Sequence, residues 1–254
     1  MQIEKIIKKH TEYPFGVCAF SHVADCLFEC RAKERLPKDA KSIICFAVPY
    51  KIKEKAPKNI SRYAAVPDYH SVLPALFLPL CEELKTAYPK NEFVFFTDNS
   101  PIHEVKAAAA AGLGVIGKNG LLINDKYGSF VFLCEIVTDL LLETTDKTAF
   151  CENCLLCEKA CPVGLCKNDC LSALTQKKAP LTPQDEEMIS SHGTVWGCDI
   201  CQNVCPHNKM AQLSQVDAFI NGYRDKYEIG EDITGRAYAW RGEKVIKRNA
   251  EIKK

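Results

Sequence analysis

The sequence lacks long hydrophobic runs and has almost no excess of charge of either sign. No stretch of the 254 residues reaches the roughly 18 apolar residues of a membrane-spanning helix. The opening residues 1–10 lack the apolar core of a signal peptide. With 33 basic and 32 acidic side chains, the net charge of +1 singles out neither nucleic acid nor a membrane surface as a partner of the whole chain. We therefore expect a cytoplasmic protein without a membrane partner.

Low-complexity segments and repeats of the solenoid type are also absent from the sequence. The composition, 47% hydrophobic and 26% charged, is typical of globular proteins, and 254 residues suffice for one large domain or two unequal ones. Cysteine is unusually abundant, at 15 residues. A disulfide framework is not expected where thiols stay reduced, so this abundance favours metal ligation.

Strand-like and helix-like runs alternate through the first part of the chain, which favours an α/β fold. Its apolar, β-rich runs have the length of buried strands, and an alanine-rich run follows a serine and a proline typical of a helix start. The expected elements are a strand over 42–50, a helix over 67–89, a strand over 92–98, a helix over 100–114 with Ser100 as N-cap, and a hairpin made of 118–125 and 128–142.

Near residue 148 the pattern changes to short pieces punctuated by cysteine, so we expect a domain boundary there. Residues 1–147 would form the α/β domain, residues 148–210 a domain stabilised by metal clusters, and residues 211–254 a polar tail of unknown role. Six cysteines outside the clustered region are typical of small buried hydrophobic residues: Cys18, Cys26, Cys30, Cys45, Cys81 and Cys134.

The stretch CENCLLCEKACP carries four cysteines in the pattern C-x2-C-x2-C-x3-C-P. In this pattern three thiolates hold one cubane cluster, and the fourth crosses to a second cluster. CDICQNVCP repeats the pattern without its first cysteine, and Cys170 is the natural replacement. The predicted ligands are Cys151, Cys154, Cys157 and Cys205 for one [4Fe–4S] cluster, and Cys161, Cys170, Cys198 and Cys201 for the other.

Two alternatives remain open for these cysteines. Cys166 lies close enough in sequence to replace Cys170 as a ligand. C-x2-C pairs also form structural zinc sites, in which four ligands surround one ion. The proline that follows the last cysteine of both stretches is typical of the two-cluster pattern and favours iron–sulfur clusters over zinc.

Two clusters alone already make a small electron carrier, which needs no further domain. We therefore expect the first domain to host the electron acceptor. Its segments 60–70 and 97–123 place polar and glycine residues where predicted strands end. Open α/β sheets bind their ligands at such strand ends.

Several ordered motifs together resemble the epoxyqueuosine reductase family. They are ISRYA and DYH, D-x-x-P-x-x-E-x-x-A, AGLG-x-IGKN, GSF-x-FL-x-EI and the two cysteine stretches, between about Phe15 and Asn208. The resemblance implies a nitroreductase-like α/β domain that holds base-off cobalamin, followed by a ferredoxin-like domain with two [4Fe–4S] clusters. It also implies reduction of epoxyqueuosine to queuosine at the wobble position of the tRNA anticodon loop. A low-potential protein such as flavodoxin or ferredoxin would supply the electrons.

The same resemblance assigns roles to individual residues. Asp98 matches the family's general acid, which must stay protonated near neutral pH. The residues that match the cofactor and substrate pocket are Arg62, Tyr63, Tyr69, His70, Gly112, Gly114, Gly117, Lys118 and Asn119. Plainer roles are open as well: Asp98 as a strand-end or helix-capping residue, His70 as an ordinary loop histidine, and the glycines as parts of a tight turn.

The chain departs from the family pattern at three places. Val115 stands where the family has tryptophan, and Ala65, Val66 and Pro67 stand where it tends to have glycine. The chain also ends soon after Cys205, so we expect a short form without the helical-repeat extension that helps grip tRNA. Two alternatives follow: a corrinoid and iron–sulfur reductase of another small molecule, or a non-catalytic electron-transfer or corrinoid-reactivating protein.

Overall fold

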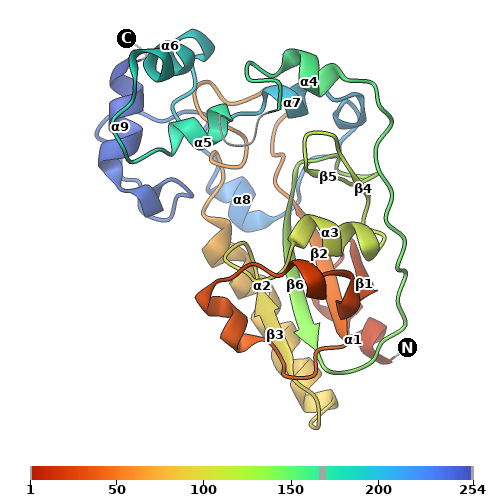
Figure 1. Cartoon of the computed structure of the whole chain (residues 1–254). Helices are drawn as coiled ribbons and strands as arrows, with labels where there is room; N and C mark the ends of the chain where they lie inside the picture. The colour runs from red at the N-terminus through yellow and green to blue at the C-terminus, as the bar shows by residue number, and fades with distance from the viewer. Residues whose placement is uncertain (1, 166–169, 253–254) are drawn as a thin grey trace. The chain divides into compact units, whose positions relative to one another are not determined.

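The computed structural model describes residues 2–165 and 170–252, and the chain divides into two compact units (Figure 1). The first unit comprises Met1–Pro49 and His70–Glu152, and the second comprises Tyr50–Tyr69 and Asn153–Lys254. The segment 50–69 thus belongs to the second unit although first-unit residues precede and follow it. Nothing in the residue pattern of 50–69 indicates this exchange.

A four-stranded sheet forms the centre of the first unit. Its strands run in the order β1 (Phe15–Ala19), β2 (Ser42–Pro49), β6 (Val131–Thr138) and β3 (Phe93–Phe96), and each neighbouring pair is antiparallel. All residues of β2 are buried, as expected of an apolar central strand. The predicted mixture of helices and strands is confirmed, with an antiparallel sheet.

One face of the sheet packs against the predicted first long helix, α2 (Tyr69–Ala87). The ring of Phe77 in α2 lies 4.5 Å from that of Phe46 in β2 and 5.9 Å from that of Phe95 in β3. The N-terminal helix α1 (Gln2–His10) is tied to α2, because Lys9 and His10 both contact the Glu83 carboxylate. Aromatic packing and these ion pairs hold α2, and with it His70, against the sheet.

The other face of the sheet is covered by α3 (Glu104–Ala110), whose alanines allow a close approach. A Cβ atom added at Gly16 of β1 would lie 2.0 Å from the carbonyl oxygen of Ala111, so only glycine fits there. The helix begins later than the sequence predicts, with His103 as N-cap in place of Ser100. The Ser100 hydroxyl instead accepts the N–H of Ile102 at 3.1 Å and donates to the buried carboxyl of Glu135 at 2.6 Å.

The hairpin predicted from 118–125 and 128–142 is wrong. Leu122–Ile123 form β5, which pairs with β4 (Val115–Ile116) in a separate two-stranded sheet, whereas 131–138 form β6 of the main sheet. The Asn124 side chain accepts hydrogen bonds from the N–H groups of Lys126 and Tyr127 and closes a turn between the two segments. The long apolar run of β6 gains more burial between β2 and β3 than a two-stranded hairpin offers.

The α-helices described in the second unit are short. They are α4 (Leu156–Ala160), α5 (Leu171–Thr175), α6 (Pro183–His192), α7 (Ile200–Asn203), α8 (Asp217–Asn221) and α9 (Glu243–Ile252). Five 3₁₀ turns complete the described elements of both units: Phe20–His22, Ala24–Cys26, Arg31–Arg35, Pro206–Asn208 and Ala239–Arg241. The helix α6 has a full capping box, in which Thr182 and Asp185 satisfy each other's backbone N–H groups.

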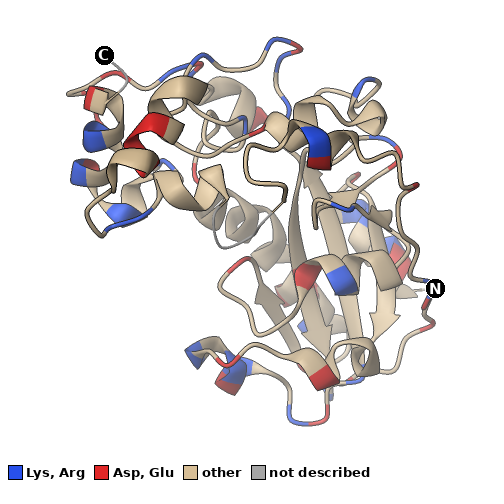
Figure 2. Cartoon of the chain, turned by 45° about the horizontal axis from the view of Figure 1, so that its top comes forward, with Lys and Arg blue, Asp and Glu red and all other residues tan. Residues whose placement is uncertain are grey.

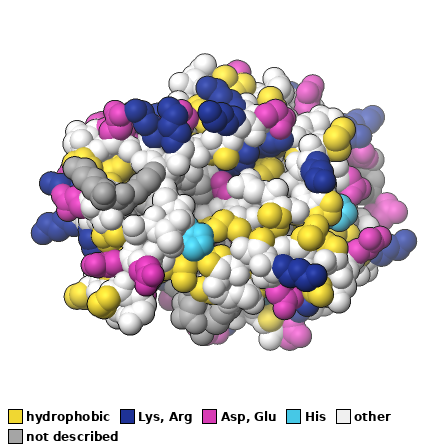
Figure 3. Space-filling model, turned by 90° about the horizontal axis from the view of Figure 1, so that it is seen from above, with side chains coloured by type: hydrophobic (Ala, Val, Ile, Leu, Met, Phe, Trp, Pro, Cys, Tyr) yellow, Lys and Arg dark blue, Asp and Glu magenta, His cyan; other side chains and the backbone are white. Residues whose placement is uncertain are grey.

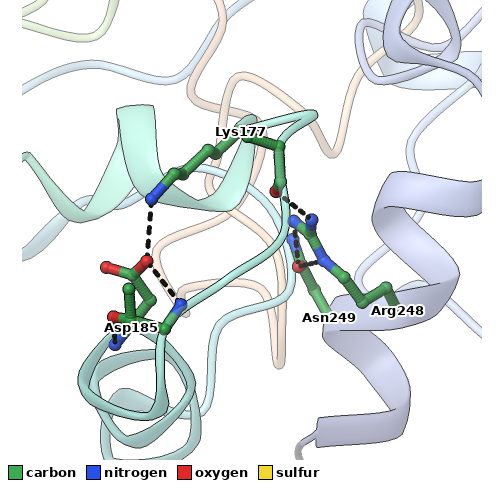
Figure 4. Close-up of polar contacts among 6 residues, drawn as sticks. Lys177, Asp185, Arg248 and Asn249 are labelled. Carbon is green, nitrogen blue, oxygen red and sulfur yellow. Dashed lines mark hydrogen bonds and ion pairs between the residues drawn. The ribbon is translucent and has the colours of Figure 1, made fainter.

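The residues of the expected tail, 211–254, contribute to the hydrophobic core of the second unit. Tyr238 packs its ring 6.0 Å from that of Trp196, and Ile246 of α9 is fully buried in the same cluster. Asn249 of α9 donates to the carbonyl oxygens of Thr175 at 2.7 Å and Val195 at 2.9 Å. Figure 4 shows neighbouring contacts, in which Lys177 pairs with Asp185 while the Arg248 guanidinium donates to the Asn249 side chain. The tail is therefore a structural part of this unit.

Charged side chains of both signs are interspersed along the chain (Figure 2), in line with the net charge of +1. On the face drawn in Figure 3, basic and acidic side chains likewise occur near one another. Among the described helices, none combines the length and apolar character needed to cross a bilayer.

Candidate functional site

The loop that follows β3 carries Asp98, the predicted general acid. Its backbone has a φ of +50°, in the left-handed region that aspartate tolerates better than most residues. Thr97, just before it, donates its hydroxyl to the carbonyl oxygen of Leu133 in β6 at 3.2 Å. The Asp98 side chain is 60% exposed. The sheet therefore fixes the start of the loop, while the acid itself faces outward.

His70 lies beside Asp98, although 28 residues separate them in the chain. The first turn of α2 presents the imidazole, whose Nε2 lies 3.0 Å from Oδ2 of Asp98. Two of the residues that the sequence predicted for the pocket are thus in direct contact. A histidine on a carboxylate can orient it and exchange protons with it near neutral pH.

Glu104 lies behind Asp98, at the start of α3. Its Oε1 accepts the backbone N–H of Asp98 at 2.6 Å, which pins the left-handed turn. Enclosure of the carboxyl, and then the neighbouring charge of Asp98, raise the pKa of Glu104 to about 8, against the opposing effects of the Asp98 N–H and of His70. Glu104 is therefore mainly protonated at neutral pH.

A fully buried carboxyl, that of Glu135, lies in the middle of β6. It is 1% exposed and stands opposite Cys45 of β2 and Phe96 of β3. The hydroxyl of Ser100 donates to its Oε1 at 2.6 Å. Burial raises the pKa of Glu135 well above its ordinary value, and the charge of Glu104 acts in the same direction. Two carboxyls that resist ionisation thus lie on the α3 side of the sheet near Asp98.

Sequence reasoning did not single out Glu104 or Glu135. Each left a signal, because Glu135 interrupts the apolar run VFLCEIVT, and Glu104 is the glutamate of the D-x-x-P-x-x-E stretch that begins at Asp98. A charged residue inside a buried strand rarely occurs without a partner or a function. The position of both relative to Asp98 depends on the antiparallel pairing of β3 with β6, which the residue pattern did not reveal.

The predicted glycine loop after α3 forms a tight turn built from its own contacts. Gly112 has a φ of +78°, in the left-handed region, and a Cβ at Gly114 would lie 2.2 Å from the carbonyl oxygen of Ile123. A Cβ at Gly117 would lie 2.5 Å from Oδ1 of Asn119, and that same oxygen accepts the N–H of Leu121 at 3.3 Å. These contacts explain the glycines locally, and a cofactor contact of this loop remains a prediction.

Lys118 connects the glycine loop to the first cluster cysteine. Its backbone N–H donates to Sγ of Cys151 at 3.3 Å, and the N–H of Cys151 donates to the carbonyl oxygen of Ile116 at 3.0 Å. Hydrogen bonds to a ligating sulfur are among the features that set the potential of an iron–sulfur cluster. Lys118 thus contacts a predicted cluster ligand through its backbone N–H.

Arg62 and Tyr63 make contacts inside the second unit. The Arg62 guanidinium donates to the carbonyl oxygens of Lys53 at 2.7 Å and Glu54 at 2.8 Å, and its N–H donates to the buried Asp199. The hydroxyl of Tyr63 accepts from Nε1 of Trp196 at 2.8 Å. These contacts hold segment 50–69 in place. Tyr69 is half-buried at the first position of α2.

Two sets of neighbouring cysteines can be distinguished among the described residues of the second unit, around Cys205 and around Cys198. Cys205 is close enough to Cys154 and Cys157 for their charges to raise its pKa, in addition to the larger effect of burial. Burial, and then the charges of Cys201 and Cys170 among others, raise the pKa of Cys198 to about 11. The helices α4 and α7, which carry Cys157 and Cys201, pack against each other.

All the cysteines among residues 2–165 and 170–252 are free thiols. Within these ranges no three His, Cys, Asp or Glu side chains converge as ligands of a single metal ion. The alternative ligand Cys166 lies outside the described residues.

Comparison with known proteins finds one family throughout. The family model "Epoxyqueuosine reductase QueG, DUF1730" matches residues 31–99. An epoxyqueuosine reductase of Gloeobacter violaceus is 39% identical over 187 residues, which cover 68% of this chain and 58% of that protein. One from Cyclobacterium marinum is 32% identical over 231 residues, which cover 85% of this chain and 73% of that protein. The chain thus spans little more than half of some of the curated relatives it matches.

Solved structures give the same result. That of epoxyqueuosine reductase from Streptococcus thermophilus superposes with a TM-score of 0.82 at 26% identity, covering 99% of this chain and 80% of that one. A Bacillus subtilis epoxyqueuosine reductase, with its catalytic aspartate loop swung out of the active site, gives 0.81 at 25% identity and covers 99% and 79%. An epoxyqueuosine reductase crystallised with an epoxyqueuosine-modified tRNA stem loop gives 0.83 at 24% identity, covers 99% and 80%, and shares the fold.

Proposed function

We propose a function from one premise, which is that this chain belongs to the epoxyqueuosine reductase family. It reduces the epoxide of epoxyqueuosine at the wobble position of tRNA to the alkene of queuosine. The observation that carries the proposal is the arrangement at the end of β3, where an exposed aspartate contacts a histidine and has the half-buried Glu104 and the buried Glu135 behind it.

The reaction fixes what the protein must supply. Removing the epoxide oxygen breaks two C–O bonds, forms one C=C bond and releases water, so it consumes two electrons and two protons. Asp98 donates a proton to the departing oxygen, because its carboxyl is exposed and lies on a loop that the sheet holds in place. His70 orients the Asp98 carboxyl through its 3.0 Å contact.

Two [4Fe–4S] clusters are the proposed route for electrons. The donor set fits, because free thiols in the second unit form one group around Cys205 and another around Cys198. The proximity of Cys205 to Cys154 and Cys157 supports the crossed assignment, and that of Cys170 to Cys198 supports Cys170 as a ligand. The ligand sets are Cys151, Cys154, Cys157 and Cys205, and Cys161, Cys170, Cys198 and Cys201.

Cobalamin is the proposed electron acceptor, on the strength of the family. Contacts within the loop account for its backbone, because a Cβ at Gly117 would meet Oδ1 of Asn119 at 2.5 Å and the Lys118 N–H donates to Sγ of Cys151, so the corrin assignment rests on the family. When bound, the corrin supplies a strongly nucleophilic reduced metal centre. The residues proposed to hold it are Arg62, Tyr63, Tyr69, His70, Gly112, Gly114, Gly117, Lys118 and Asn119.

The remaining partners follow from the same chemistry. A low-potential cytoplasmic carrier such as flavodoxin or ferredoxin would reduce the clusters one electron at a time. The tRNA anticodon loop would bring the substrate, as the modified stem loop does in the related structure.

Mass spectrometry tests the proposal directly. Protein reconstituted with iron, sulfide and cobalamin is given a strong chemical reductant and a stem loop that carries epoxyqueuosine. We expect conversion to queuosine, and strongly slowed conversion with Asp98→Asn loaded equally. Retention of iron and corrinoid without any conversion would contradict the proposal and favour a reductase of another small molecule or an electron-transfer protein.

A further inference from the structure

The proposed reaction consumes two protons, but one aspartate delivers only one before it must be protonated again. Asp98 becomes a carboxylate after the first C–O bond breaks. The oxygen then remains on carbon as a hydroxyl group, and it needs a second proton to leave as water. The group that supplies this proton to Asp98 has to lie close to it, and it has to be neutral before turnover.

Glu104 meets the geometric condition. Its carboxyl is in direct contact with the Asp98 residue, because Oε1 accepts the Asp98 N–H at 2.6 Å. The charges of the two carboxyls interact, and that of His70 interacts with Glu104 as well. A rotation of the exposed Asp98 side chain or one bridging water would connect the two carboxyls.

We propose that Glu104 holds the second proton of the reaction and passes it to Asp98 after the first C–O bond has broken. This inference rests on the proposed function. In each turnover Asp98 protonates the epoxide oxygen, Glu104 reprotonates Asp98, and Asp98 then protonates the leaving hydroxyl. Two electrons from the low-potential donor balance the two protons, and solvent afterwards restores both carboxyls.

The surroundings of Glu104 support a neutral carboxyl. The titratable groups with which Glu104 and Glu135 interact are Asp98 after β3, His70 in α2, Cys18 in β1, Cys45 in β2 and Cys134 in β6. Of these only His70 can carry a positive charge, and it also contacts Asp98. Burial and this scarcity of cations agree with the raised pKa of about 8 for Glu104.

Glu104→Gln separates proton storage from a purely structural role. Glutamine is neutral, has nearly the same shape, and its amide oxygen can still accept the Asp98 N–H. If Glu104 only anchors the loop, the variant should turn over like the wild type. If it stores a proton, multiple-turnover rates at pH 7 should fall by about 10²-fold. The exposed Glu143→Gln serves as a matched control and should keep the wild-type rate.

The pH profile adds a readout that loop anchoring would not move. Wild-type turnover should decline as pH rises through about 8, where Glu104 loses its proton. This decline should be absent from the residual activity of Glu104→Gln and present in Glu104→Asp, which keeps a transferable proton. Equal rates and identical pH profiles for wild type and Glu104→Gln would overturn the inference.

Infrared spectroscopy of the full chain without cofactors tests the stored proton independently of catalysis. At pH 7 the wild type should show a protonated-carboxyl C=O band that is missing from Glu104→Gln and disappears as the pH passes about 8. A Glu104 carboxylate already ionised at pH 7 would refute the inference even if the tRNA is reduced. If Glu104 is protonated at pH 7 but the protein never reduces the tRNA, the stored proton on Glu104 is supported and only the proposed substrate is refuted.

Discussion

At the scale of single residues, Asp98 has two separate properties, the conformation of its backbone and the carboxyl group of its side chain. The left-handed φ of +50° favours aspartate, asparagine or glycine over other residues. A conformational reason and a chemical reason for an aspartate therefore coincide at this position. A substitution informs about the chemistry only if it keeps the backbone conformation.

Asp98→Asn meets this requirement, because asparagine also tolerates the left-handed region. It removes the transferable proton and can still contact His70. We expect turnover to fall by roughly 10²–10⁴-fold, with unchanged iron and corrinoid content and unchanged thermal stability. Stopped-flow and end-point assays on protein of known cofactor content measure this. Loss of cofactor, with undiminished turnover per bound corrinoid, would instead identify Asp98 as a structural residue.

The raised pKa of Glu104 also affects stability. The folded protein holds a proton on Glu104 up to about pH 8, whereas an unfolded glutamate releases it near 4.5. Between these values the folded state binds more protons at Glu104, so the contribution of Glu104 to stability is largest below pH 4.5 and falls as the pH rises to 8. The slope from one such group is at most about 1.4 kcal/mol per pH unit.

Glu104→Gln should therefore flatten the pH dependence of unfolding between pH 5 and 8, relative to wild type. Urea unfolding at several pH values measures the slope, and Glu143→Gln should leave it unchanged. If the free energy of unfolding of the wild type instead rises with pH across this window, and Glu104→Gln leaves this dependence unchanged, then Glu104 is ionised in the folded protein.

At the scale of elements, the apolar runs predicted β2, β3 and α2, because burial and propensity agree within each run. The start of α3 was missed because Ser100 bonds to Glu135, a contact with another strand. The pairing of β6 was missed because a turn signal near Asn124 does not reveal which strands it joins. The sequence alone also does not reveal which side chains meet at the end of β3. Asp98 and His70 were therefore predicted only from the family resemblance, and Glu104 and Glu135 were recognised only in the folded structure.

The polar composition of residues 211–254 did not reveal the structural role of helix α9. Its Asn249 donates two buried hydrogen bonds, to Thr175 and Val195. Asn249→Ala should lower the free energy of unfolding by about 1–3 kcal/mol, because both acceptors lose their donor in a buried place. Denaturant unfolding with Lys247→Ala, an exposed neighbour on the same helix, gives the baseline. Equal stability of the two variants would mean that water replaces the amide.

At the scale of the whole molecule, the crossed ligand pattern predicts how cluster content responds to one substitution. Reconstituted wild type should contain about eight irons per chain. Cys205→Ser should deplete the cluster assigned to Cys151, Cys154 and Cys157 and spare the other, so iron falls to about four and one paramagnetic signal remains on reduction. Loss of the cluster built around Cys198 and Cys201 instead would refute the crossed assignment. Two zinc ions with negligible iron would refute both clusters.

The assignment of residues 50–69 to the second unit has a consequence for how the chain is made. Tyr63 contacts Trp196 across 133 residues, and Ile60 and Ala64 belong to the same core as Tyr238. While the ribosome is still adding residues after Glu152, the first unit already has its whole sequence, but the core of the second unit has only its earliest members. Contacts between such distant residues close slowly. The second unit therefore cannot complete its core until α9 has been synthesised, and until then segment 50–69 lacks part of the core into which it packs.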